Sequence, residues 1–222
     1  MGKYRTNEQE CVVSERLIVT VDIDDVLFAT AQSILDHYGE TYGVSVDPAD
    51  FYSKEPSVWG VEDYSEATSR VCKYLASQAF SQREPIDQAY EGLTALRQNG
   101  ARLIPLTGRD DTQKEATNRL LKRSFAGVFH QETIFSNYFN DRRRTKGELC
   151  YEYGADYHID DHIDHINSLS ALAEYATRGV LYGEYAWSKV EPAAATTLEA
   201  PNWTVLPELI LSDYESDRTH LL

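Results

Sequence analysis

Short apolar segments alternate with amphipathic segments along residues 86–182, and this alternation restricts the fold more than any other feature of the chain. A β-branched run over residues 16–22 comes first. We further expect strands over 101–106, 132–135, 157–159 and 179–182, and helices over 86–98, 111–123, 146–153 and 163–174. Strands that alternate with helices form a parallel sheet with right-handed crossovers. The sequence therefore predicts an α/β protein with a Rossmann-like parallel sheet flanked by helices.

The segment 29–85 interrupts this pattern. It contains two helical stretches, 29–42 and 63–80, around a loop rich in proline and aromatic residues. We interpret it as a small helical cap inserted after the first strand. We expect a flexible leader over 1–14, a core formed by 15–28 and 86–212, the cap over 29–85, and an acidic tail over 213–222. A short helix is expected near 207–211, just before the tail.

The net charge of -15 over 222 residues disfavours long nucleic acid and anionic membranes as partners. A small phosphorylated substrate stays compatible with this charge, because a bound metal ion can override the global field. No run of residues has the length of a membrane span, and no apolar signal segment is found. Three cysteines without metal-site spacing indicate reduced thiols. We therefore expect a cytoplasmic protein; homo-oligomerisation stays open.

Acidic residues follow the first strand directly, as Asp22-Ile23-Asp24-Asp25. Like charges at this density require a bound cation or raised pKa values. Asp22 and Asp24 point the same way in an extended chain, so one can act as a nucleophile and the other as a proton donor and acceptor. The alternative is a strand end followed by helix-capping acids.

The strand over 101–106 ends at Thr107-Gly108-Arg109. A threonine hydroxyl and a free backbone amide at a strand end can hold a phosphoryl oxygen, and Arg109 can hold a second phosphate. The alternative is an ordinary strand-to-helix turn.

Lys146 begins a helix, and Asp160 and Asp161 follow the strand over 157–159. A lysine can neutralise a nucleophile and a transferring phosphoryl group, although Lys122 competes for this role. Carboxylate oxygens suit Mg²⁺. We disfavour a zinc or iron site at the nearby histidines, because they are expected to face different directions; these are His158, His162 and His165.

Together, these four segments resemble the haloacid-dehalogenase-like (HAD) superfamily. The resemblance implies that Asp22 is a nucleophile forming an aspartyl-phosphate and that Asp24 is the general acid/base, with its backbone carbonyl on the metal. It implies that Thr107 binds the phosphoryl group, next to the Gly108 backbone considered above, that Lys146 steadies its charge, and that Asp22 and Asp161 share Mg²⁺. Asp160 would lie beside Asp161 as a further candidate metal ligand, and the choice between the two as the direct ligand stays open. Asp164 would place Lys146, and Asp25 stands where a glycine is common.

The cap position, the Ile159-to-Asp164 segment and the late segment 181–187 resemble deoxyribonucleotidase-type 5′-nucleotidases. This implies a phosphomonoesterase acting on nucleoside monophosphates. Four aromatic residues could stack on a base, although packing in the core or the cap is favoured for each: Phe28, Tyr52, Trp59 and Tyr64. Two alternatives remain. One is a phosphatase of the same superfamily for polynucleotide ends or sugar phosphates, and the other is a non-catalytic binding module on this scaffold.

Overall fold

A computed structural model describes residues 17–138, 140–171, 177–189 and 197–220. The expected leader over 1–14 lies outside the described residues. Six strands form one sheet in the order β3-β2-β1-β4-β5-β6, and every neighbouring pair is parallel. The strands are β1 (Ile18–Val21), β2 (Arg102–Thr107), β3 (Ile134–Phe135), β4 (Tyr157–Asp160), β5 (Arg178–Tyr182) and β6 (Leu198–Ala200).

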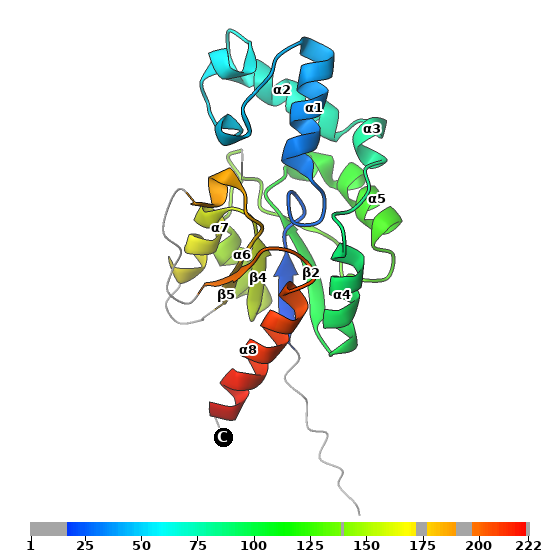
Figure 1. The fold of residues 1–222 in the computed structure, drawn as a ribbon, viewed down its shortest axis with the longest axis vertical. Helices are drawn as coiled ribbons and strands as arrows, with labels where there is room; N and C mark the ends of the chain where they lie inside the picture. The colour runs from blue at the N-terminus through cyan, green and yellow to red at the C-terminus, as the bar shows by residue number, and fades with distance from the viewer. Residues whose placement is uncertain (1–16, 139, 172–176, 190–196, 221–222) are drawn as a thin grey trace, which may run out of the picture.

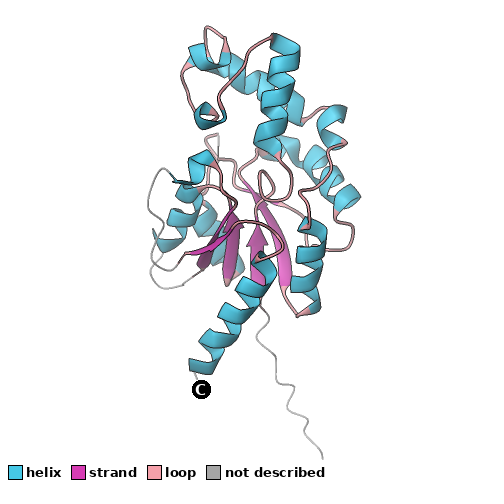
Figure 2. Cartoon of the chain, viewed as in Figure 1, coloured by secondary structure: helices cyan, strands magenta, loops and turns pink. Residues whose placement is uncertain are grey.

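Helices cover both faces of the sheet, which confirms the predicted α/β class (Figure 2). The α-helices of the core are α4 (Ala89–Gln98), α5 (Lys114–Ser124), α6 (Lys146–Tyr153), α7 (Ile163–Ser168) and α8 (Leu206–His220). Short 3₁₀ helices accompany them: η3 (Asp111–Gln113), η4 (Leu169–Ala171) and η5 (Ala186–Lys189).

The core divides into two apolar clusters because successive strand residues point to opposite faces of a sheet. Val19 and Val21 of β1 join α4, α5 and α8 in the larger cluster, while Ile18 joins α6 and α7 in the smaller one. The central strands β1, β2 and β4 are buried on both faces, as expected for a parallel sheet covered by helices. The site residues at the strand ends therefore rest on a rigid, fully packed support.

A helical insertion follows β1, as predicted, and lies over the carboxyl ends of the strands (Figure 1). Its elements are α1 (Thr30–Tyr42), η1 (Pro48–Asp50), η2 (Pro56–Trp59), α2 (Tyr64–Leu75) and α3 (Gln78–Ser81). α1 ends because Gly43 adopts a left-handed conformation, with φ of 68°. The single helix expected over 63–80 is instead the two helices α2 and α3, because Ser77 caps the second one through Phe80 N.

The C-terminal region differs from expectation in two places. The short helix expected near 207–211 is α8, which continues to His220, so most of the expected acidic tail is helical. The side chain of Asp213 anchors α8 to the sheet by accepting a hydrogen bond of 2.6 Å from the Tyr157 hydroxyl. Strand β6 was not predicted, because three residues carry too little periodicity to recognise.

Candidate active site

The loop after β1 carries the first three acids. Asp22 follows the strand directly, and the indole N–H of Trp203 fixes the loop by donating to Val26 O at 2.8 Å. Asp25 adopts a left-handed backbone conformation, with φ of 56°. Its carboxylate accepts the Ala31 N–H at 3.0 and 3.1 Å and so caps α1. Aspartate tolerates this conformation better than most other non-glycine residues, and the capping contact holds it there.

Lys146 is the first residue of α6, and local sequence fixes its place. Thr145 and Glu148 form a capping box at the start of α6. A Cβ on Gly147 would lie 2.2 Å from Ser168 O, so only glycine lets α6 approach so closely. The start of α6 is thereby held against the 3₁₀ turn that follows α7.

The Lys146 ammonium lies between two acids from different strands. Its Nζ is 2.8 Å from Asp22 Oδ1 and 2.5 Å from Asp160 Oδ2, with 1% of the side chain exposed. Burial lowers the pKa of Lys146, but the charges of Asp160 and Asp22 outweigh burial and raise it above the ordinary value. Lys122, the competing candidate, is exposed near the end of α5. The structure therefore brings Lys146, and not Lys122, to the acids.

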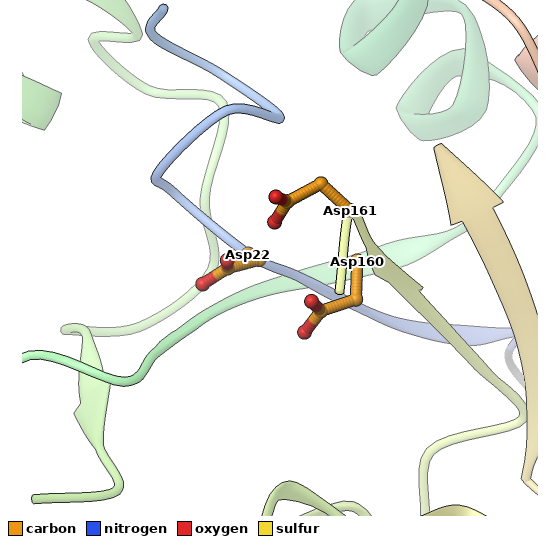
Figure 3. Close-up of side chains that lie close together, drawn as sticks. All are labelled: Asp22, Asp160 and Asp161. Carbon is orange, nitrogen blue, oxygen red and sulfur yellow. The ribbon is translucent and has the colours of Figure 1, made fainter. Parts of the chain in front are cut away.

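Three acids converge at the adjoining ends of β1 and β4 (Figure 3). One oxygen from each of Asp22, Asp160 and Asp161 lies within 4.8 Å of those from the other two, and all three residues are buried. β1 and β4 are also the neighbouring strands between which the strand order reverses, and ligands usually bind beyond the carboxyl ends of the strands at this point.

Asp160 is surrounded by protein donors. Its Oδ2 contacts Lys146 and His158 Nε2, the latter at 2.9 Å. Its Oδ1 accepts the His162 N–H at 2.9 Å and lies 3.1 Å from His165 Nδ1. Burial raises the pKa of Asp160, but Lys146, His165 and these hydrogen bonds hold it well below the ordinary value. Both oxygens of Asp160 are therefore already used within the protein.

The expected placement of Lys146 by Asp164 is wrong. The Asp164 side chain is 56% exposed and lies 4.0 Å from His162 Nδ1. Within the part of the chain that the structure describes, Lys146 forms its ion pairs with Asp22 and Asp160 and not with Asp164. Asp160 performs the placement instead. The reason is geometric: Asp164 lies in the first turn of α7, where its side chain faces solvent.

Asp161 follows β4 and is held from the other side, by η5. Trp187 Nε1 donates to Asp161 Oδ2 at 2.6 Å, and Ser188 Oγ donates to Asp161 O at 2.7 Å. Burial, together with the charges of Asp160, Asp25 and Asp22, raises the pKa of Asp161 well above the ordinary value. Its ionised form therefore needs a further positive charge.

The ionised form of Asp22 also needs a further positive charge. Burial raises the pKa of Asp22 to about 6, the charges of Asp160 and Asp24 add to this, and Lys146 opposes it. Asp22 Oδ1 is buried, and within the described part of the chain the Lys146 ammonium, 2.8 Å away, is the one polar side-chain group recorded against it, leaving acceptor capacity unused. A buried carboxylate with unused acceptor capacity beside a second one fits a hard divalent ion such as Mg²⁺.

Asp24 forms a two-pronged ion pair with Arg109, which was expected to face a substrate. Arg109 Nε and Nη2 donate to the two carboxylate oxygens of Asp24 at 2.8 and 2.6 Å, and Arg109 Nη1 donates to Thr117. Thr30 Oγ1 also donates to Asp24, at 2.6 Å. Burial raises the pKa of Asp24, but Arg109 and Thr30 lower it overall. In this arrangement Asp24 is an anion.

The Thr107-Gly108 turn lies at the end of β2, which neighbours β1. Thr107 is fully buried, and its Oγ1 accepts the Arg109 N–H at 3.2 Å. Tyr138 N donates to Gly108 O at 3.1 Å and fixes the turn from the opposite side. The turn is therefore ordered next to the acids.

Among the four aromatic residues considered for base stacking, Tyr52 is the one that lies next to the site. It is 43% exposed, and its ring packs against those of Trp187 and His162, with centroids 5.5 and 4.8 Å away. Phe28 packs on Phe125 in the core. Trp59 packs on Tyr38 within the cap, and Tyr64 is partly buried against the core cluster.

No family model matches this sequence, and no curated protein does. Solved structures do match. A predicted phosphoglycolate phosphatase from Haemophilus somnus 129PT superposes with a TM-score of 0.61 at 12% identity, covering 89% of this chain and 99% of that one. A HAD-superfamily hydrolase from Ehrlichia chaffeensis gives 0.54 at 16% identity, covering 89% and 97%.

This chain has the HAD fold. A third HAD structure, YfnB from Bacillus subtilis, was solved bound to magnesium and matches with a TM-score of 0.58 at 12% identity, covering 88% of this chain and 98% of that one. The HAD arrangement of a core sheet with a helical cap after the first strand is the one described above.

Several residues of the HAD-like site were not predicted from the sequence. His158 and His165 were considered only as zinc ligands, whereas in the structure they contact Asp160. Trp187 was noted only within a segment resemblance, and its hydrogen bond to Asp161 was not anticipated. The alternation of strand residues offered one signal, because it places His158 and Asp160 on the same face of β4.

Proposed function

We propose that this protein is a Mg²⁺-dependent phosphomonoesterase in which Asp22 attacks phosphorus. The observation that carries the proposal is the meeting of Asp22, Lys146 and Asp161 at one strand edge, with Lys146 Nζ 2.8 Å from Asp22 Oδ1. A phosphatase that works through an aspartyl ester needs an ionised nucleophile, a fixed cation and a hard metal site. These three requirements coincide here.

In the proposed reaction an Asp22 oxygen bonds to phosphorus as the ester P–O bond breaks, and Asp24 gives a proton to the leaving oxygen. A water molecule then attacks the aspartyl-phosphate, Asp24 takes its proton, and the P–O bond to Asp22 breaks to release phosphate. Thr107 and the Gly108 amide would hold phosphoryl oxygens, and Lys146 would neutralise charge on the nucleophile and the phosphoryl group.

The Arg109 pair favours Asp24 as the base, because it lowers the Asp24 pKa. To act as the acid, Asp24 must first take up a proton from solvent or from the substrate phosphate, and this requires that Arg109 shift part of its hydrogen bonding to a phosphoryl oxygen when substrate is bound. We propose this for Arg109, in place of a separate site for a second phosphate, because its guanidinium is 4% exposed and already contacts Asp24 and Thr117.

We propose that Asp22, Asp161 and the Asp24 carbonyl hold Mg²⁺, whereas Asp160 supports the site from behind. The oxygens of Asp160 are engaged by Lys146 and the neighbouring histidines. When bound, Mg²⁺ would offset the repulsion between the carboxylates and the phosphate and polarise the phosphoryl group.

A row of aromatic rings favours a nucleoside monophosphate as substrate. The row is Tyr52–His162–His165–Tyr138, with ring centroids 4.8, 5.2 and 5.1 Å apart in turn. It extends from the cap to the Gly108 turn and can stack on a planar base. The free thiols Cys72 and Cys150 are in keeping with the cytoplasmic location that we propose.

The test is phosphate release by the purified protein with Mg²⁺ from nucleoside monophosphates, phosphoglycolate, a sugar phosphate and a 3′-phosphorylated oligonucleotide. We expect release that Asp22→Asn abolishes and that Asp164→Asn, an exposed control in the same site segment, leaves unchanged. Tyr52→Ala should raise KM for a nucleotide more than for phosphoglycolate. Absence of release from every ester by wild-type protein would reject the proposal.

A further inference from the structure

Trp187 lies in η5 and contacts both the candidate metal site and the cap. Its indole N–H donates to Asp161 Oδ2 at 2.6 Å, and the side chain is buried. The hydrogen bond uses one oxygen of Asp161 and fixes the plane of the carboxylate. The remaining oxygen is then available to a metal ion shared with Asp22.

The indole ring carries this contact into the cap. Phe51 and Tyr52, between η1 and η2, pack on Trp187 with ring centroids 5.7 and 5.5 Å away. On its other side Trp187 stacks on Tyr185, with centroids 4.8 Å apart and planes 5° apart. The Tyr185 hydroxyl donates to Asp25 O at 2.7 Å. One aromatic stack thus joins the cap, the nucleophile loop and a candidate ligand.

We infer that Trp187 is a positioning residue that orients Asp161 for Mg²⁺ and makes this orientation depend on where the cap lies. The inference rests on the proposed function, because it presupposes the metal site. An outer partner that orients a ligand typically contributes 10–100-fold in metal affinity. An indole without the packing of Phe51 and Tyr52 would hold Asp161 less firmly.

Trp187→Phe keeps an aromatic ring and removes the N–H donor. The matched control is Trp59→Phe, which removes an indole donor that is also buried but that serves Ser53 O within the cap, at 2.9 Å. Phe51→Ala tests the cap side of the stack while leaving the hydrogen bond to Asp161 in place. If Trp187→Phe does not fold, Phe51→Ala still tests the inference.

Isothermal titration of substrate-free protein with Mg²⁺ measures affinity without turnover. We expect Trp187→Phe to raise the Kd for Mg²⁺ by about 10–100-fold. Phe51→Ala should raise it by about fivefold, which is the low end for a coupling between two sites. Trp59→Phe should change it by no more than about twofold. Raised Mg²⁺ should also restore the activity of Trp187→Phe, which a general folding defect would not allow.

Two outcomes would overturn the inference in distinguishable ways. If wild type binds Mg²⁺ and both Trp187→Phe and Phe51→Ala bind it equally well, the positioning role is wrong while the phosphatase proposal stands. If wild-type protein shows no Mg²⁺ binding, the inference and the metal site of the proposed function fail together.

Discussion

Replacing Asp22 by asparagine should stabilise the metal-free protein even though it should abolish activity. Asp22 is 4% exposed and close to other buried acids, so its negative charge is costly in the folded state. Asparagine has the same shape without the charge. A gain in stability from removing the proposed nucleophile would be a sign that burying its negative charge, in the first place, and the neighbouring acids, in the second, destabilise the metal-free site.

The size of the effect follows from the pKa. Burial raises the Asp22 pKa from 3.8 to about 6, and this net value already includes the attraction of Lys146. One pKa step is worth about 1.4 kcal/mol, so the ionised side chain costs roughly 3 kcal/mol above pH 6. Because the folded pKa is the higher one, this cost is absent below about pH 4 and grows as pH rises to about 6. For a chain of this size, roughly 3 kcal/mol corresponds to about 6–12 °C in Tm.

The assay is thermal unfolding of wild type and Asp22→Asn between pH 4 and 8, with chelator and with saturating Mg²⁺. In chelator the variant should melt higher at pH 7 and the two curves should converge near pH 4. Mg²⁺ at a hundred times Kd should stabilise wild type by about 2.7 kcal/mol and leave the variant nearly unchanged. The exposed control Asp164→Asn should follow wild type. An Asp22→Asn protein less stable than wild type at pH 7 in chelator would refute the reasoning.

Two further predictions concern buried contacts beside the site. Asp24→Asn leaves the guanidinium of Arg109 buried without a carboxylate, so it should lower the free energy of unfolding, measured in urea, by about 3 kcal/mol. The double variant Asp24→Asn with Arg109→Met should recover part of this loss. An Asp24→Asn protein as stable as wild type would contradict the buried character of the pair. Gly147→Ala places a Cβ 2.2 Å from Ser168 O and should lower the free energy of unfolding by about 2–4 kcal/mol. Gly39→Ala in α1 meets only an ordinary contact at 3.9 Å and should raise it by about 0.5–1 kcal/mol. Equal Tm values for the two variants would count against the packing argument.

The sheet and the positions of the candidate site residues could be predicted because they depend on local patterns. Apolar runs identified the strands near their observed bounds, and parallel strands place their carboxyl ends at one edge. The helix over 146–153 was predicted with its observed bounds, because Gly154 marks its end; the structure adds a capping box at its start. This was enough to bring Asp22, Lys146 and Asp161 together.

The partners of individual side chains could not be predicted, because they depend on distances across the fold. The choice between Asp160 and Asp164 as the partner of Lys146 depends on which way each side chain points after β4. Arg109 was expected to face a substrate, but its ion pair with Asp24 joins residues 85 positions apart. Sequence spacing carries no information about such a contact.

The acids of this site differ in how well the protein compensates their charge, and this difference points to the proposed roles. Asp24 has Arg109, and Asp160 has Lys146 and the histidines, so both have lowered pKa values. Asp161 has one neutral donor, and Asp22 shares the Lys146 cation with Asp160. Negative charge is thus left uncompensated where Asp22 and Asp161 approach each other. A divalent ion there would relieve the repulsion between them, whereas the same ion beside Asp24 or Asp160 would compete with existing cations.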